Sequence, residues 1–170
     1  MPMPHHALAQ AVLISWKRNG AYGVRLVEDV APAAWVAQPM PTATMNHPAW
    51  IFSHLNLYAD IAVRMARGER FDDPAEHRYG QKSQPQRSVA AYEGKDALLA
   101  AWKRHHDDGE AVLATMGGEL MASPNPLERW RVLHPTVGDM LVTLMVKHES
   151  AHLGQMSAWR RAMNMVPVAM

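Results

Sequence analysis

Two histidines near the end of the chain, His148 and His152, have the spacing of a metal-binding pair. On a helix, residues four apart lie one turn apart on the same face, and two imidazoles placed in this way can share a divalent metal ion. Together with Glu149 they form the pattern H-E-x-x-H, in which metalloproteases use the glutamate as a general base. The first hypothesis is therefore a zinc protease.

The residues that follow the pair disfavour the protease. Such enzymes need a third ligand downstream, either a carboxylate on the next helix or a histidine six residues on. Residues 153–170 contain no His, Asp or Glu, and the position six residues beyond His152 is Ala158. A third ligand must therefore come from upstream.

Six upstream histidines are candidates for the third ligand: His47, His54, His77, His105, His106 and His134. His54 is favoured because it lies in the middle of an expected helix, within its apolar stripe, where a buried imidazole needs a polar partner. His47 starts that helix and His134 precedes a proline, so both are expected to be exposed. A lone core histidine and a chance His-x-x-x-His pair are each common. Their combination in a chain without cysteine favours a metal held by His54, His148 and His152.

Two neighbours of the pair have undecided roles. Glu149 points about 100° away from His148 on a helix, and the simplest expectation is a surface carboxylate. Gln155 lies on the same side as His152, where either a hydrogen bond to a ligand or ordinary helix packing would explain it.

Composition narrows the classes of function. The chain has 170 residues, of which 48% are hydrophobic, and we expect one domain spanning residues 1–170. A net charge of +1 without a long run of one sign predicts no nucleic-acid or membrane partner. The absence of cysteine excludes disulfides, zinc–thiolate sites and a cysteine nucleophile. Residues 1–6 do not resemble a signal peptide and no apolar run has transmembrane length, so a cytoplasmic location is expected.

Hydrophobic periodicity predicts four helices, at about residues 4–30, 46–67, 94–122 and 136–165. Asn46 and Thr136 are expected to cap the second and fourth helices, with Asp139 completing a capping box, and Gly68 is expected to end the second. Possible interruptions are Asn19-Gly20, Gly23 and Asp107-Asp108-Gly109. The predicted fold is all-α, a four-helix bundle with long connecting loops. The longest polar stretch, residues 69–93, is expected to cover a site.

The two histidine-bearing segments, Asn46–Leu55 and His148–Gln155, resemble the DinB-like (DinB/YfiT) family. Shorter stretches at residues 79–83, 135–139 and 158–161 resemble one branch of it, so the similarity spans most of the chain. The resemblance implies a bundle of up-down-down-up type, often a homodimer. It also implies a zinc, nickel or iron ion held by three histidines at the open end of the bundle.

Carried over by motif position, these metal ligands are His54, His148 and His152. His47 stands where this branch is expected to have a non-ligating residue. Relatives include transferases and isomerases that use mycothiol, bacillithiol or glutathione. The resemblance therefore implies a metal-dependent reaction between a low-molecular-weight thiol and an electrophile, and the thiol must be brought in because the chain has no cysteine.

Three neutral imidazoles would leave the metal its full charge to activate a bound thiol or water. Glu149 and Tyr79 are candidates for proton transfer. Hydrolysis by a metal-activated water is an alternative, as is a non-catalytic metal site in a stress-related dimer. An open coordination position that faces a cavity would favour an enzyme.

Overall fold

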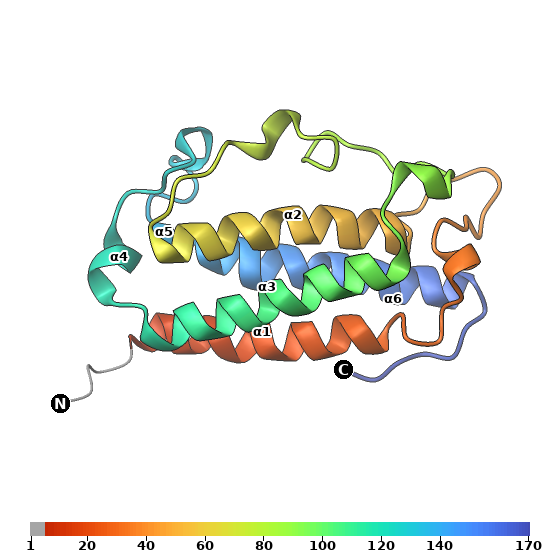
Figure 1. Ribbon diagram of the computed structural model, residues 1–170, viewed down its shortest axis with the longest axis horizontal. Helices are drawn as coiled ribbons and strands as arrows, with labels where there is room; N and C mark the ends of the chain where they lie inside the picture. Colours follow the sequence, from red (N-terminus) through yellow and green to blue (C-terminus); the bar gives the residue numbers. More distant parts are fainter. Residues whose placement is uncertain (1–5) are drawn as a thin grey trace.

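The computed structural model describes residues 6–170, and within that range it is built from helices and their connections (Figure 1). Three long helices are α1 (Ala7–Arg25), α2 (Pro48–Arg67) and α3 (Lys95–Thr115). The fourth consists of α5 (Val137–Leu141), a π-helical segment η5 (Val142–His148) and α6 (Glu149–Ala162). Shorter pieces are α4 (Gly118–Ala122) and the 3-10 turns η1 (Pro32–Ala34), η2 (Pro74–Glu76), η3 (Val89–Ala91) and η4 (Glu128–Trp130).

The helices follow the expected up-down-down-up order. In Figure 1, α1 and the α5–α6 helix run in one direction, while α2 and α3 both run in the other. Because α2 and α3 are parallel, the connection between them must return along the length of the bundle. This yellow-green segment crosses over α2 in Figure 1 and contains the predicted polar loop. The all-α bundle with long connections is thus confirmed.

The start of α2 differs by one residue from the expectation. His47, not Asn46, is the cap: its Nδ1 accepts a hydrogen bond from the Trp50 amide at 3.2 Å. Its Nε2 donates to the Gln86 carbonyl at 2.9 Å. His47 is fully buried, so the prediction of an exposed His47 is wrong. Gly68 ends the helix in the left-handed conformation, with φ 69°, as expected.

The fourth helix begins as predicted, because Thr136 and Asp139 form a capping box. The third helix is shorter than expected. Met116 adopts an extended conformation after Thr115, and Gly117 is the N-cap of α4, so residues 94–122 form two helices and not one.

Glycines inside α1 and α3 allow close packing and do not interrupt the helices. A Cβ atom at Gly109 would lie 2.6 Å from Nε1 of Trp16, and one at Gly20 would lie 2.5 Å from Nδ1 of His106. These contacts are too short for any side chain, so α1 and α3 can approach only where glycine leaves room. The expected breaks at residues 19–23 and 107–109 are therefore wrong, and tertiary packing explains the glycines.

The core runs the length of the bundle, with the indoles of Trp16, Trp102 and Trp159 almost completely buried in it. Among the described residues, no helix is both long and apolar enough to cross a membrane. The π-helical segment η5 is the irregular part of the fourth helix. π-Helices are rare and frequently occur at functional sites, and this one ends at His148.

Candidate metal centre

Three imidazoles converge where α2 meets the fourth helix. The Nε2 atom of His148 lies 2.9 Å from Nε2 of His54 and 3.1 Å from Nε2 of His152. The three nitrogens lie within 4.8 Å of one another. The structure thus brings together all three residues that the sequence proposed as metal ligands.

Hydrogen bonds fix the orientation of two of these rings. Nδ1 of His54 donates to the Tyr79 carbonyl oxygen at 2.6 Å, and Nδ1 of His152 donates to Oε1 of Gln155 at 2.8 Å. Each ring therefore directs an unprotonated Nε2 at His148. A neutral His148 can donate a proton to at most one of these two nitrogens. In at least one of the two contacts, therefore, both nitrogens direct a lone pair at each other at hydrogen-bond distance.

Burial keeps the three rings neutral. It lowers the pKa of His54 to about 4 and that of His148 to about 2, with the neighbouring imidazoles adding to both shifts. The pKa of His152 is also lowered by burial. Protons therefore do not relieve the crowding of lone pairs at neutral pH, and a cation among the nitrogens would.

The spacing of the nitrogens fits a metal ion. Two nitrogens about 2.1 Å from one metal lie about 3.0 Å apart when the angle between them is 90°, and about 3.4 Å apart at the tetrahedral angle. The two Nε2 separations match the smaller angle, which adjacent ligands of an octahedral ion would have. Imidazole suits zinc, nickel and iron alike, so the donor set does not distinguish among the metals that the resemblance implies.

A cavity of about 250 Å³ opens beside the triad, which lines part of its wall. Aromatic side chains from two segments form the sides: Trp50 and Tyr58 of α2, and Trp130 of η4. Met140, Thr143 and Leu144 of the fourth helix form another wall. The three nitrogens therefore face a space that could hold a ligand.

The long polar loop covers this site, as expected. Its Tyr79 carbonyl holds His54, its Ser83 hydroxyl accepts a hydrogen bond from Nε1 of Trp50 at 3.1 Å, and its Gln81 lines the cavity. Gln155 is engaged on the other side, where its Oε1 also accepts from Nδ2 of Asn46 at 2.8 Å. The hydrogen-bonding role considered for Gln155 is thus present.

The two candidates for proton transfer, Tyr79 and Glu149, have different surroundings. Tyr79 contributes its backbone to the site, while its hydroxyl donates to the Ala91 carbonyl at 2.7 Å. Glu149 is 1% exposed, so the prediction of a surface carboxylate is wrong. Its Oε2 lies 3.4 Å from Nε2 of His106, which packs between Trp16 and Trp102. Burial raises the pKa of Glu149 well above the usual range.

Tyr58 is a site residue that the sequence reasoning missed. Its ring centroid lies 4.8 Å from that of His54 and 5.0 Å from that of His148. Burial raises the pKa of its phenol. The signal was available, because Tyr58 follows His54 by four residues on one helix face. Nothing in the sequence marked Trp130, which reaches the cavity from a distant turn.

The remaining candidate histidines, His77, His105, His106 and His134, lie outside the cluster of three converging histidines. His134 is half-buried, not exposed as expected, and its Nδ1 lies 3.2 Å from the hydroxyl of Thr143.

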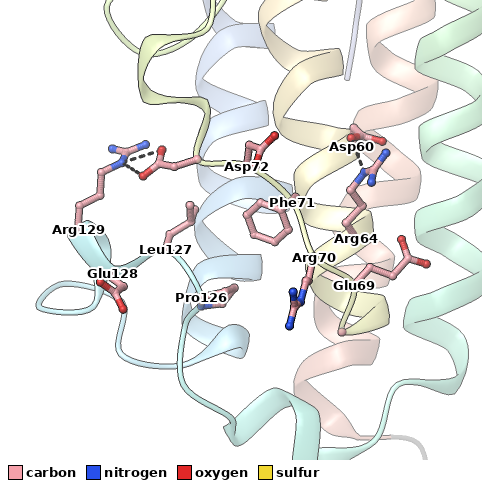
Figure 2. Close-up of a pocket in the computed structure, with 12 residues that line it drawn as sticks. Asp60, Arg64, Glu69, Arg70, Phe71, Asp72, Pro126, Leu127, Glu128 and Arg129 are labelled. Carbon is pink, nitrogen blue, oxygen red and sulfur yellow. Dashed lines mark hydrogen bonds and ion pairs between the residues drawn. The ribbon is translucent and has the colours of Figure 1, made fainter.

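A second, larger hollow of about 1130 Å³ lies beyond the C-terminal half of α2 (Figure 2). Its lining is rich in charge, but much of that charge is paired within the chain. Arg129 binds Asp73 at 2.7 Å and Arg64 binds Asp60 at 2.8 Å. We therefore take the smaller cavity, with its converging nitrogens, as the candidate functional site.

Comparison with known proteins agrees with this choice. A family model described as the DinB superfamily matches residues 16–156, a range that includes all three converging histidines. No significant match is found among curated proteins or among solved structures.

Proposed function

The chain belongs to the DinB superfamily, and from this premise we propose that it is a metal-dependent enzyme that transfers a low-molecular-weight thiol to an electrophile. The metal would be held by His54, His148 and His152. The observation that carries the proposal is the convergence of three neutral Nε2 atoms on one point beside a cavity. A purely structural metal site would be closed by protein ligands, whereas this one borders open space.

The chain's own residues would orient the reaction. The Tyr79 carbonyl and the Gln155 side chain hold the His54 and His152 rings with Nε2 toward the metal. When bound, a divalent metal supplies the positive charge that lowers the pKa of a coordinated thiol. The aromatic walls would exclude water from the sulfur and from the electrophile.

The proposed transfer is balanced without a redox partner. The thiol sulfur forms a bond to an electrophilic carbon, the bond to the leaving group breaks, and the thiol proton ends on the leaving group or the buffer. The thiol is a co-substrate, because the chain contains no cysteine.

Two measurements test the proposal. The first is elemental analysis of protein purified without a histidine tag, in wild type and in His54→Ala, with His105→Ala as the matched control outside the triad. We expect about one metal per chain in wild type and control, and loss of the metal in His54→Ala. Equal metal in all three proteins would refute the assignment of His54.

The second measurement is a screen of thiols and electrophiles with the metal-loaded protein, in which loss of free thiol is monitored. Turnover that requires both the metal and a thiol supports the transferase. Turnover of esters or amides without a thiol would instead indicate a hydrolase.

A further inference from the structure

The cavity beside the triad has an uncharged protein lining. Among the described residues that line it, none is Asp, Glu, Lys or Arg. The nearby hollow of Figure 2, by contrast, is lined by several residues of each sign. A charged group that entered the smaller cavity would lose water and find no opposite charge on the protein, which is costly.

The Arg129 side chain borders the cavity wall, and its charge is paired with Asp73. The Arg129 guanidinium lies 5.0 Å from the centroid of the Trp130 ring, and its Nε binds the Asp73 carboxylate. Arg129 lines the larger hollow and not the smaller one. Its Nη1 also donates to Oε1 of Gln81 at 3.2 Å, so the guanidinium contacts the cavity wall while its charge is paired with Asp73.

The walls suit a flat apolar group. The Trp50 ring stacks on His54, with centroids 4.6 Å apart and planes 15° apart, and Tyr58 and Trp130 also line the space. Met140 and Leu144, both buried, complete the apolar lining. The volume of about 250 Å³ is below the range of about 300–1,000 Å³ that holds drug-sized ligands, so one ring system of one or two rings fits.

We propose that the electrophilic substrate of this site carries an uncharged, apolar ring-sized group, which binds between the aromatic walls and the fourth helix. That the bound molecule is a substrate rests on the proposed function, whereas the preference for an uncharged apolar group rests on the cavity alone. Thr143 also lines the cavity, and its hydroxyl lies 3.2 Å from Nδ1 of His134. The side chain offers no charge to an ionic substituent.

Binding of three matched probes tests the preference: 1-naphthylmethanol, 1-naphthoate and 1-naphthylmethylammonium. Calorimetry on the full chain, both metal-free and metal-loaded, gives each affinity. In the metal-free protein we expect the neutral probe to bind at least about tenfold more tightly than either ion. Equal or tighter binding of an ion to the metal-free protein would overturn the proposal. In the metal-loaded protein, the carboxylate could bind the metal itself, so that form reports the metal's contribution.

Variants locate the binding and exclude a folding artefact. Trp130→Ala should weaken binding of the neutral probe by about tenfold or more, whereas Phe71→Ala, in the larger hollow, should leave it unchanged. Thr143→Lys should shift the preference toward 1-naphthoate, and the isosteric Thr143→Val should keep the preference for the neutral probe. If Thr143→Lys and Thr143→Val show the same preference, the probe does not bind in this cavity and the proposal fails.

Failure of this inference and failure of the proposed function give different results. Preferential binding of the neutral probe without thiol-dependent turnover would support the binding preference of the cavity and refute the proposed transferase function. Thiol-dependent turnover of charged electrophiles only would support the transferase function and refute the preference for an uncharged group.

Discussion

The backbone carbonyl of Tyr79 accepts a hydrogen bond from Nδ1 of His54 at 2.6 Å, across 25 positions of sequence. A surface loop thereby determines which nitrogen of a helix-borne histidine faces the candidate metal site. In metal proteins, such outer hydrogen bonds fix the tautomer and raise the basicity of the ligand. The loop that returns the chain between two parallel helices is thus also part of the site.

Gly80 makes this hydrogen bond sensitive to one methyl group. A Cβ atom at Gly80 would lie 2.3 Å from the Pro74 carbonyl oxygen, so Gly80→Ala must displace the loop next to Tyr79. We expect metal affinity to fall by about 10–100-fold, measured by competition with a chelator. Gly154→Ala is the control: it lies two residues from His152, has nothing within 4 Å of its new Cβ, and should leave the affinity unchanged. A similar affinity in both variants would show that the loop does not tune His54.

Gln155 should influence the metal through His152. Gln155→Leu removes the oxygen that accepts from Nδ1 of His152, and we expect a loss of about 10–100-fold in metal affinity. Gln155→Glu keeps an acceptor at that place and should restore the affinity to within a few-fold. Loss of affinity in both variants would indicate that the amide itself, including its bond to Asn46, is required.

His106 should make the metal-free protein sensitive to acid. Burial between two indole rings lowers its pKa from 6.5 to about 3. The pKa of His106 is lower in the folded state than in the unfolded state. The stability that His106 contributes is therefore fully present above pH 6.5, and it is lost by about 1.4 kcal/mol per pH unit as the pH falls toward 3. His106→Phe keeps a ring between the indoles but removes the titration. Between pH 7 and pH 5, its unfolding free energy in urea should fall by about 2 kcal/mol less than that of wild type. An equal fall would mean that His106 is protonated when folded.

Glu149 should act in the opposite direction. Burial raises its pKa, so the folded state binds the proton more tightly than the unfolded state does. The stability it contributes is present at pH values below its unfolded pKa and is lost as the pH rises toward its folded pKa. One carboxylate oxygen, Oε1, is buried without a hydrogen-bond partner. We expect Glu149→Gln to be more stable than wild type at pH 8 by about 1–3 kcal/mol, with a smaller difference at pH 5. A less stable variant at pH 8 would show that the charge is stabilised by its surroundings.

The sequence predicted the bundle and the triad because both depend on local periodicity. His148 and His152 are four residues apart, and His54 interrupts an apolar stripe, so helix geometry alone brings each to an inner face. The expectations failed where tertiary contacts decide. Gly20 and Gly109 looked like helix breaks, yet they admit His106 and Trp16 from the facing helix.

The burial of the Glu149 carboxyl group could not be predicted from the sequence either. Glu149 follows His148 directly, but its partner His106 lies on another helix, and no spacing rule connects Glu149 with His106. Trp130 is a comparable case, since a 3-10 turn carries it to the cavity from a segment with no periodic signal. The single domain, the homodimer and the cytoplasmic location stay predictions.

The π-helical segment Val142–His148 separates two parts of one helix. A wide turn of this kind corresponds to one residue inserted into an α-helix, and removing that residue would rotate the helix before it by about 100° relative to the helix after it. Thr143 and Leu144 belong to the wide turn, while His152 lies after it. Over evolutionary time, insertion or deletion of one residue here could therefore change which molecules the cavity accepts, while the His-x-x-x-His pair is inherited intact.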